Sequence, residues 1–95
     1  MSKHFIAVLV PQEGDRWRAH FPDLPGCRAE GERMETATDR AAEAAYQLIS
    51  RMRERGEALP ESRTLEDIYR DAAWARERGI DWSKAVVSIV PVRLP

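Results

Sequence analysis

The hydrophobic residues change their spacing once, near residue 34, and this change limits what the chain can fold into. Before that point, apolar side chains alternate with polar ones or form short runs, as in β-strands. After it, they recur every three or four residues up to about residue 55, as on one face of an α-helix. Strands followed by one long amphipathic helix predict an α+β domain in which the helix covers a sheet.

Three strands are expected ahead of the helix. Residues 3–10 are apolar on both alternating faces, which is typical of a central strand that is covered on both sides. Residues 16–21 alternate polar and apolar side chains, which indicates a strand with one buried face. The two prolines and the glycine of residues 21–26 must turn the chain into a short third strand at residues 27–31. We expect these strands to form an antiparallel meander.

The predicted helix, residues 34–55, carries an alanine-rich stripe that allows it to lie close to the sheet. Its first residue is preceded by Arg33, where a capping Ser, Thr or Asp is expected. A proline-bearing connection follows, and then a short helix begins after Thr64. Residues 85–94 predict a last strand at a sheet edge, because Pro91 cannot donate to a ladder. We expect it to run parallel to the first strand, since helical crossovers usually connect parallel strands.

Length and charge restrict the class of protein. The chain has 95 residues, 15 Lys and Arg against 16 Asp and Glu, and a net charge of -1. This length predicts a single domain over residues 1–95. The balanced charge argues against a protein that coats nucleic acid, although it allows separate charged patches. No apolar run is long enough for a membrane span or a signal peptide, so we expect a cytoplasmic protein.

Few residues offer catalytic or metal-binding chemistry. His4 and His20 lack the spacing of metal ligands, and we expect a structural or exposed role for each. Cys27, the only cysteine, is expected to be a small buried residue rather than a nucleophile. We expect Asp23 to cap its own turn. Residues 5–10 contain no carboxylate, and the chain has no glycine-rich phosphate loop. We therefore predict no enzymatic activity, no metal site and no cofactor.

Several motifs, in a fixed order, resemble those of the HicB antitoxin family. They are residues 21–27 (FPDLPGC), the alanine-rich helix, residues 56–61 (GEALPE), and the last strand with its Val90-Pro91-Val92 segment. The resemblance covers essentially the whole chain. It implies a small β-β-β-α-β domain with a degraded ribonuclease H-like fold, here with an extra short helix before the last strand. It also implies that the protein binds and neutralises a HicA-type toxin, a small mRNA-cleaving protein.

The chain departs from the family pattern at two places. It ends at Pro95, so we expect no C-terminal DNA-binding module and no DNA binding by this chain alone. Arg33 stands where the family has a capping Thr or Ser, which should cost about 1 kcal/mol of helix stability. The lack of a carboxylate on the first strand agrees with a fold that has lost metal-dependent nuclease chemistry.

A protein that masks an RNA-binding toxin should present an acidic surface, because the toxin's own surface must hold phosphates. The carboxylates near the third strand and the start of the helix are therefore the predicted toxin contacts: Asp23, Glu30, Glu32, Glu35 and Asp39. An equally consistent alternative is that they are solvated acids at the start of a helix.

The apolar last strand predicts self-association into a homodimer or a higher homo-oligomer. The residues expected at this interface are Val86, Val90, Val92 and Leu94. Because Pro91 limits a continuous ladder, a face-packed dimer is favoured. Two other functions stay open: an RNA-binding protein or residual ribonuclease that uses the arginine-rich helix ends, and a dimeric interaction domain without a toxin.

Overall fold

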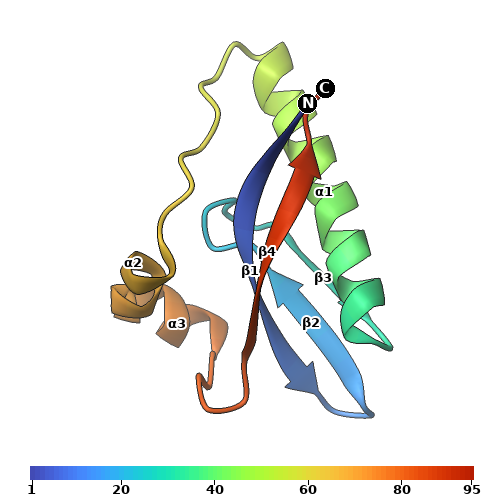
Figure 1. Ribbon diagram of the computed structural model, residues 1–95, viewed down its shortest axis with the longest axis vertical. Helices are drawn as coiled ribbons and strands as arrows, with labels where there is room; N and C mark the ends of the chain where they lie inside the picture. The colour runs from blue at the N-terminus through green and yellow to red at the C-terminus, as the bar shows by residue number, and fades with distance from the viewer.

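A four-stranded antiparallel sheet separates one long helix from two short ones (Figure 1). The computed structural model describes residues 1–95. The sheet order is β3-β2-β1-β4, and its strands are β1 (Ser2–Gln12), β2 (Arg16–His20), β3 (Arg28–Gly31) and β4 (Val86–Arg93). Helix α1 (Met34–Glu54) packs on one face, and α2 (Leu65–Arg70) and α3 (Ala72–Arg78) lie on the other. None of the three helices has a stretch that could span a membrane.

The strand positions follow the hydrophobic pattern. β1 is the central strand, and its Leu9 pairs with Ala19 of β2 on one side and with Val86 of β4 on the other. β4 lies at a sheet edge, as Pro91 predicts. The first three strands form the expected antiparallel meander. The mixed α+β class and this part of the topology are therefore confirmed.

The direction of β4 corrects the expectation, because β4 runs antiparallel to β1. Helix α1 returns the chain to the end of the sheet where β1 begins (Figure 1). Residues 56–85 then run back along the other face, so β4 starts beside the far end of β1, where Val86 pairs with Leu9. The expectation assumed that α1 alone connects β3 to β4. In the structure the connection runs along the sheet twice, first as α1 and then as residues 56–85, so β4 points in the opposite direction.

The main core lies between α1 and the sheet. Ala37, Ala41, Ala45 and Ile49 are fully buried there, and three alanines in this stripe let the helix lie close to the strands. The approach is tightest at Gly31, the last residue of β3. A Cβ atom at Gly31 would lie 2.6 Å from the backbone nitrogen of Ala37, so only glycine fits below the first turn of α1.

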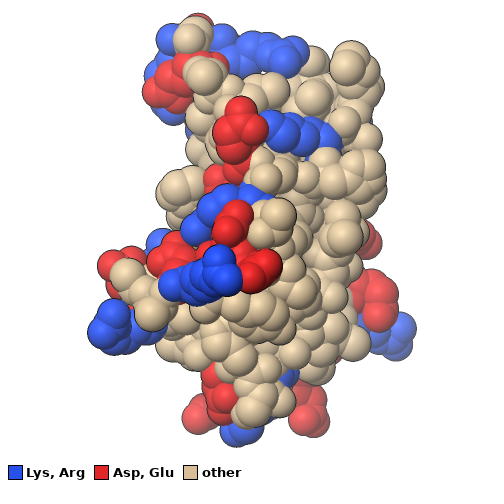
Figure 2. Space-filling model, turned by 60° about the vertical axis from the view of Figure 1, so that its left-hand side comes forward, with Lys and Arg blue, Asp and Glu red and all other residues tan.

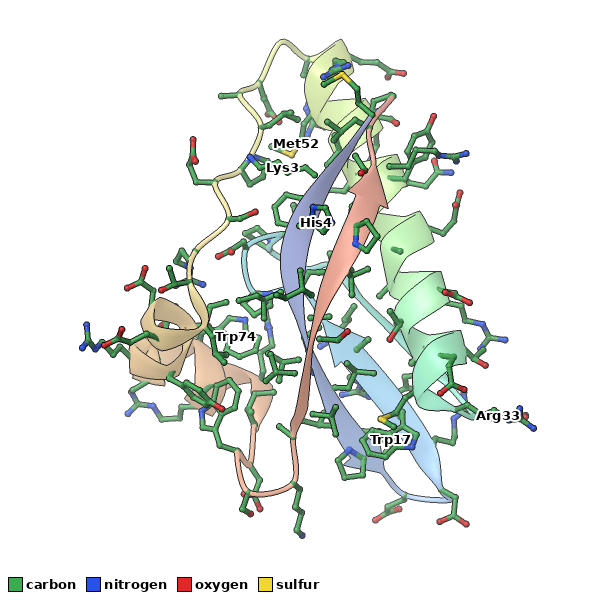
Figure 3. The ribbon with its side chains drawn as sticks, in the orientation of Figure 1. Lys3, His4, Trp17, Arg33, Met52 and Trp74 are labelled. Atoms are coloured by element: carbon green, nitrogen blue, oxygen red, sulfur yellow. The ribbon has the colours of Figure 1, made fainter.

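The helix starts differ in how they are capped. Arg33 makes no capping hydrogen bond at the start of α1, as predicted, and its side chain points away from the helix (Figure 3). α2 begins after Thr64, as expected, and the Thr64 hydroxyl accepts a hydrogen bond from the backbone N–H of Asp67 at 3.2 Å. The long helix therefore depends on packing rather than on a cap.

A second, smaller core covers the other face of β1. Ile68 of α2 is fully buried against Val8 and Val10, and Trp74 and Trp82 pack beside them. This layer explains why β1 is apolar on both faces. It also places α2, α3 and the loop after them over the face on which the alternating pattern of β2 predicted polar, exposed residues.

Candidate functional site

A groove of about 340 Å³ lies between the first turns of α1 and the edge strand β4. It combines an apolar surface with two carboxylates that stand one helical turn apart, Glu35 and Asp39. Both acids are exposed, and neither forms an ion pair within the protein. The other residues that line the groove are Leu9, Met34, Thr38, Val86 and Ser88.

The groove fits a basic side chain of another molecule. The aliphatic stem of a Lys or Arg can pack on apolar atoms while its charged head group binds a carboxylate. Val86 supplies such a surface, because 40% of it is exposed at the edge of the sheet. Glu35 and Asp39 supply the charge. This arrangement can bind a basic protein surface.

The other predicted toxin contacts lie outside this groove. Glu30 is on the opposite face of the sheet, where it forms an ion pair with Arg18, its register partner on β2. The Nε atom of Arg18 donates to Glu30 at 2.9 Å, and this hydrogen bond lowers the pKa of Glu30. Glu32 is exposed in the turn between β3 and α1. The structure therefore brings Glu35 and Asp39 together but not all five acids.

Asp23 does not cap its own turn, and this corrects the expectation for that residue. Only 4% of its side chain is exposed, and its two oxygens accept hydrogen bonds from Arg63. The donors are the backbone N–H of Arg63 at 2.7 Å and its Nε at 2.5 Å. The contact of Asp23 with a toxin stays a prediction, whereas its contact with Arg63, forty residues later, is intramolecular.

Arg63 joins Asp23 to the third helix. Its Nη1 atom donates to Asp71 at 2.9 Å, and the other oxygen of Asp71 accepts from the backbone N–H of Trp74 at 3.0 Å. The bond from Trp74 caps α3. The hydrogen bonds to Asp23 and Asp71 raise the pKa of Arg63, and the bonds from Arg63 and Trp74 lower the pKa of Asp71. Sequence reasoning missed Arg63, because nothing in its local sequence distinguishes it from a solvated arginine.

Two further hydrogen bonds hold the connection between α1 and α2 (residues 56–64) against the start of β1. Lys3 donates its Nζ to the carbonyl oxygen of Pro60 at 2.7 Å, and Ser62 donates its hydroxyl to the carbonyl oxygen of His4 at 2.6 Å. Figure 3 shows Lys3 and His4 in the first part of β1, on the side of this connection. The FPDLPG turn and the start of β1 therefore both hold the connection that contains the GEALPE segment.

The residues predicted at a dimer interface occupy different environments. Val90 and Val92 are buried in the main core, and Leu94 packs against it. Val86 is partly exposed at the groove. The most exposed apolar side chain of β4 is Ile89, at 69%, which was not in the predicted set.

Cys27 is buried, as predicted. Its sulfur lies 3.5 Å from the carbonyl oxygen of Ala41, and burial raises its pKa to about 11. The thiol is therefore protonated near neutral pH and is a poor nucleophile. No group of three or more His, Cys, Asp or Glu side chains lies close enough together to hold a metal ion.

The two histidines differ. His4 is exposed, whereas His20 is only 3% exposed, with its ring 6.0 Å from the Trp74 ring. The sequence placed His20 on the polar face of its strand, but α3 covers that face, so its Nε2 atom is buried without a hydrogen-bond partner. Burial lowers the pKa of His20 to about 4, with further contributions from Arg18, Arg28 and Arg78. The imidazole is therefore neutral near pH 7.

Comparison with known structures gives the same fold. The N-terminal domain of a Burkholderia pseudomallei antitoxin HicB aligns with a TM-score of 0.75 and 24% identity, covering 97% of this chain and all of that one. A chain of a HicA3 and HicB3 toxin-antitoxin complex aligns with a TM-score of 0.63 and 20% identity, over 93% and 95% of the two chains. A chain of a toxin-antitoxin complex from Streptococcus pneumoniae aligns with a TM-score of 0.73 and 20% identity, over 98% and 70%.

Sequence comparison supplies the family. None of the curated proteins matches the chain. The family model of the HicB-like antitoxins of bacterial toxin-antitoxin systems matches residues 5–94, which is nearly the whole sequence. This match includes the FPDLPG turn, the alanine-rich helix, the GEALPE segment and the last strand. The chain therefore belongs to the HicB-like antitoxin family.

Proposed function

We propose that this protein is an antitoxin that neutralises a HicA-type, mRNA-cleaving toxin in the cytoplasm by binding it, without catalysis of its own. The family match over residues 5–94 carries this proposal. The similarity to a chain of a HicA3 and HicB3 complex supports it. We also propose that any descent from ribonuclease H has left no nuclease chemistry, because β1 contains no carboxylate that could bind a catalytic metal ion.

The groove between α1 and β4 is our proposed toxin contact. A protein that cleaves mRNA needs basic side chains to hold phosphates, and Glu35 and Asp39 present two unpaired carboxylates to such a surface. Exposed apolar atoms of Val86 lie in the same groove, so a partner can bury apolar area together with the charges. Glu32 lies two residues before α1 and extends the acidic surface. Asp23 and Glu30 are already paired with arginines, so we assign them a smaller part.

The charge of this groove should control toxin affinity. We expect the double variant Glu35→Lys and Asp39→Lys to bind the toxin about 100-fold more weakly, because two attractive charges become repulsive ones. The measurement is isothermal titration with an inactive toxin, the small basic protein sought in the neighbouring reading frame.

Glu43→Lys with Glu54→Lys is the matched control, since it makes the same change of charge elsewhere on α1. Unchanged affinity in the groove variant would move the contact to another face. An equal loss of affinity in both variants would show that the net charge of the protein, and not the groove, determines toxin affinity.

We also propose a homodimer through the β4 edge. β4 is an edge strand with exposed Ile89 and partly exposed Val86. The other predicted interface residues, Val90, Val92 and Leu94, belong to the main core or pack against it. Figure 2 shows charged residues of both signs at the top, left and bottom of its view and at its lower right margin, with a mostly uncharged area in the centre and upper right. Such an exposed apolar edge favours contact with a second copy. Because Pro91 limits a continuous ladder, we propose that the two copies pack through side chains rather than through one continuous sheet.

Light scattering tests this proposal. The wild type is expected at twice the chain mass of 10.9 kDa, and Ile89→Lys at the monomer mass, because a charge would be buried in the contact. Ser83→Lys, a charge added in the loop before β4, should leave the dimer intact. A wild-type mass of one chain at working concentration would refute the dimer.

A further inference from the structure

A second hollow, of about 270 Å³, lies on the sheet face opposite the acidic groove. Three cationic side chains from separate parts of the chain converge on it: Arg18 of β2, Arg78 of α3 and Lys84 of the loop before β4. Its remaining lining residues are Val10, Pro11, Gln12, Gly79 and Asp81. Unlike the groove beside α1, this hollow is mainly polar and carries more positive than negative charge.

The positive charge extends across this face of the sheet. Arg16 pairs in register with Gln12, and Arg28 pairs with His20, so both arginines alternate onto the same side as Arg18. Neither Arg16 nor Arg28 forms an ion pair within the protein, and neither do Arg78 and Lys84. Burial is the main cause of the lowered pKa of His20, and the nearby charges of Arg18, Arg28 and Arg78 lower it further.

The two carboxylates of this region are already engaged. Glu30 pairs with Arg18. Asp81 accepts hydrogen bonds from the backbone N–H and the hydroxyl of Ser83, at 3.0 and 2.6 Å. The hollow is therefore lined by three cations and one carboxylate, Asp81, and Arg16 and Arg28 add positive charge on the same face, in a protein whose net charge is -1. This surplus is larger than one carboxylate of a partner would neutralise, and it suits an anion with several charges.

Two aromatic rings in contact lie next to this region: Trp82, which is partly buried, and Tyr69, which is exposed. Trp82 stands between Asp81 and Lys84, two residues that line the hollow. Its ring lies 4.5 Å from the ring of Tyr69 of α2, and 49% of Tyr69 is exposed. Cationic side chains beside exposed aromatic rings are the features that bind single-stranded nucleic acid, since phosphates pair with the cations and bases stack on the rings.

We propose that this face binds single-stranded nucleic acid, with backbone phosphates in the hollow lined by Arg18, Arg78 and Lys84 and a base stacked on Tyr69. The site shares Arg78 with the arginine-rich helix ends considered from the sequence, but its other cations, Arg18 and Lys84, come from β2 and from the loop before β4. It lies on the sheet face opposite the acidic groove, so it does not depend on the proposed toxin contact, and both partners can be bound at once.

Fluorescence anisotropy with a labelled single-stranded RNA of about 12 nucleotides tests the proposal. We expect wild-type binding to weaken steeply between about 50 and 200 mM salt. Arg78→Glu with Lys84→Glu should lower the affinity at least about 10-fold and reduce the salt slope by about two. The matched control is Arg53→Glu with Arg55→Glu at the end of α1, which makes the same change of charge and should have little effect.

Tyr69→Ala separates nucleic acid from a free phosphate compound. It should weaken RNA binding about 10-fold through lost stacking while leaving the affinity for pyrophosphate unchanged. Circular dichroism checks that each variant is folded, and Arg78→Gln with Lys84→Gln replaces the glutamate pair if that pair unfolds.

Three results would overturn the proposal. One is no RNA binding by the wild type at the lower salt concentration. Another is an equal loss of affinity in the control pair, which would reduce the effect to net charge. The third is pyrophosphate binding with no effect of Tyr69→Ala on RNA, which would make the hollow a site for free phosphate compounds.

Discussion

Replacing Asp23 with alanine is expected to lower the free energy of unfolding by about 2–3 kcal/mol. The substitution leaves Arg63 without its most buried partner, and the backbone N–H of Arg63 also loses its acceptor. Removing one partner of a fully buried ion pair costs about 3–5 kcal/mol. We expect less here, because a third of the Arg63 side chain is exposed and Asp71 remains as its second partner. Urea unfolding near neutral pH measures the loss.

Two variants make this result specific. Asp23→Asn keeps an acceptor for one donor of Arg63 and should lose about half as much. Glu66→Ala removes a carboxylate from the Glu66–Arg70 pair, whose side chains are 70% and 72% exposed, and should change stability by less than about 0.5 kcal/mol. A loss below about 1 kcal/mol in Asp23→Ala would contradict the role of Asp23 as an anchor for the connection.

Acidification is expected to destabilise the protein through His20. Its pKa is about 4 in the folded protein and 6.5 when unperturbed, so the unfolded chain binds more protons between these values. Stability should therefore be complete above about pH 6.5 and fall as the pH decreases towards 4. His20 is only 3% exposed, so solvent screens this effect little. Between about pH 7 and pH 5 we expect a loss of about 2 kcal/mol.

His20→Leu isolates this contribution, because leucine cannot bind a proton. Its unfolding free energy should be about 2 kcal/mol less sensitive to the same pH change than that of the wild type. His4→Leu, at an exposed position, should follow the wild-type pH dependence. Asp71, whose pKa is lowered from 3.8, loses its contribution only below that pH and does not interfere. Parallel curves for wild type and His20→Leu would contradict the prediction.

Local patterns were sufficient to predict most elements of the fold. The alternation in β1 and β2, the change to helical spacing and the prolines each act on neighbouring residues. They predicted the central position of β1, the edge position of β4, the uncapped start of α1 and the burial of Cys27. The short motifs that indicated the family are also local, and the family match over residues 5–94 confirms that assignment.

The candidate sites were less predictable, because each joins residues that are far apart in the chain. The sequence singled out Glu35 and Asp39, but their groove exists because β4 returns beside β1 and places Val86 opposite α1. The cations of the second hollow lie on β2, α3 and the loop before β4. Net charge hides this separation, since the acidic groove and the basic hollow lie on opposite faces of the sheet.

The sequence by itself determined which segments become strands and helices and to which family the chain belongs. Only the tertiary structure decided the direction of β4, the burial of His20 and the pairing of Asp23 with Arg63. The physical reason is the path of residues 56–85. Burial of Ile68 against Val8 and Val10 places this segment on the sheet face opposite α1. The local sequence of the segment does not specify that face. The spacing of apolar residues indicates which face of a helix or strand is buried, but it does not indicate which distant segment covers that face.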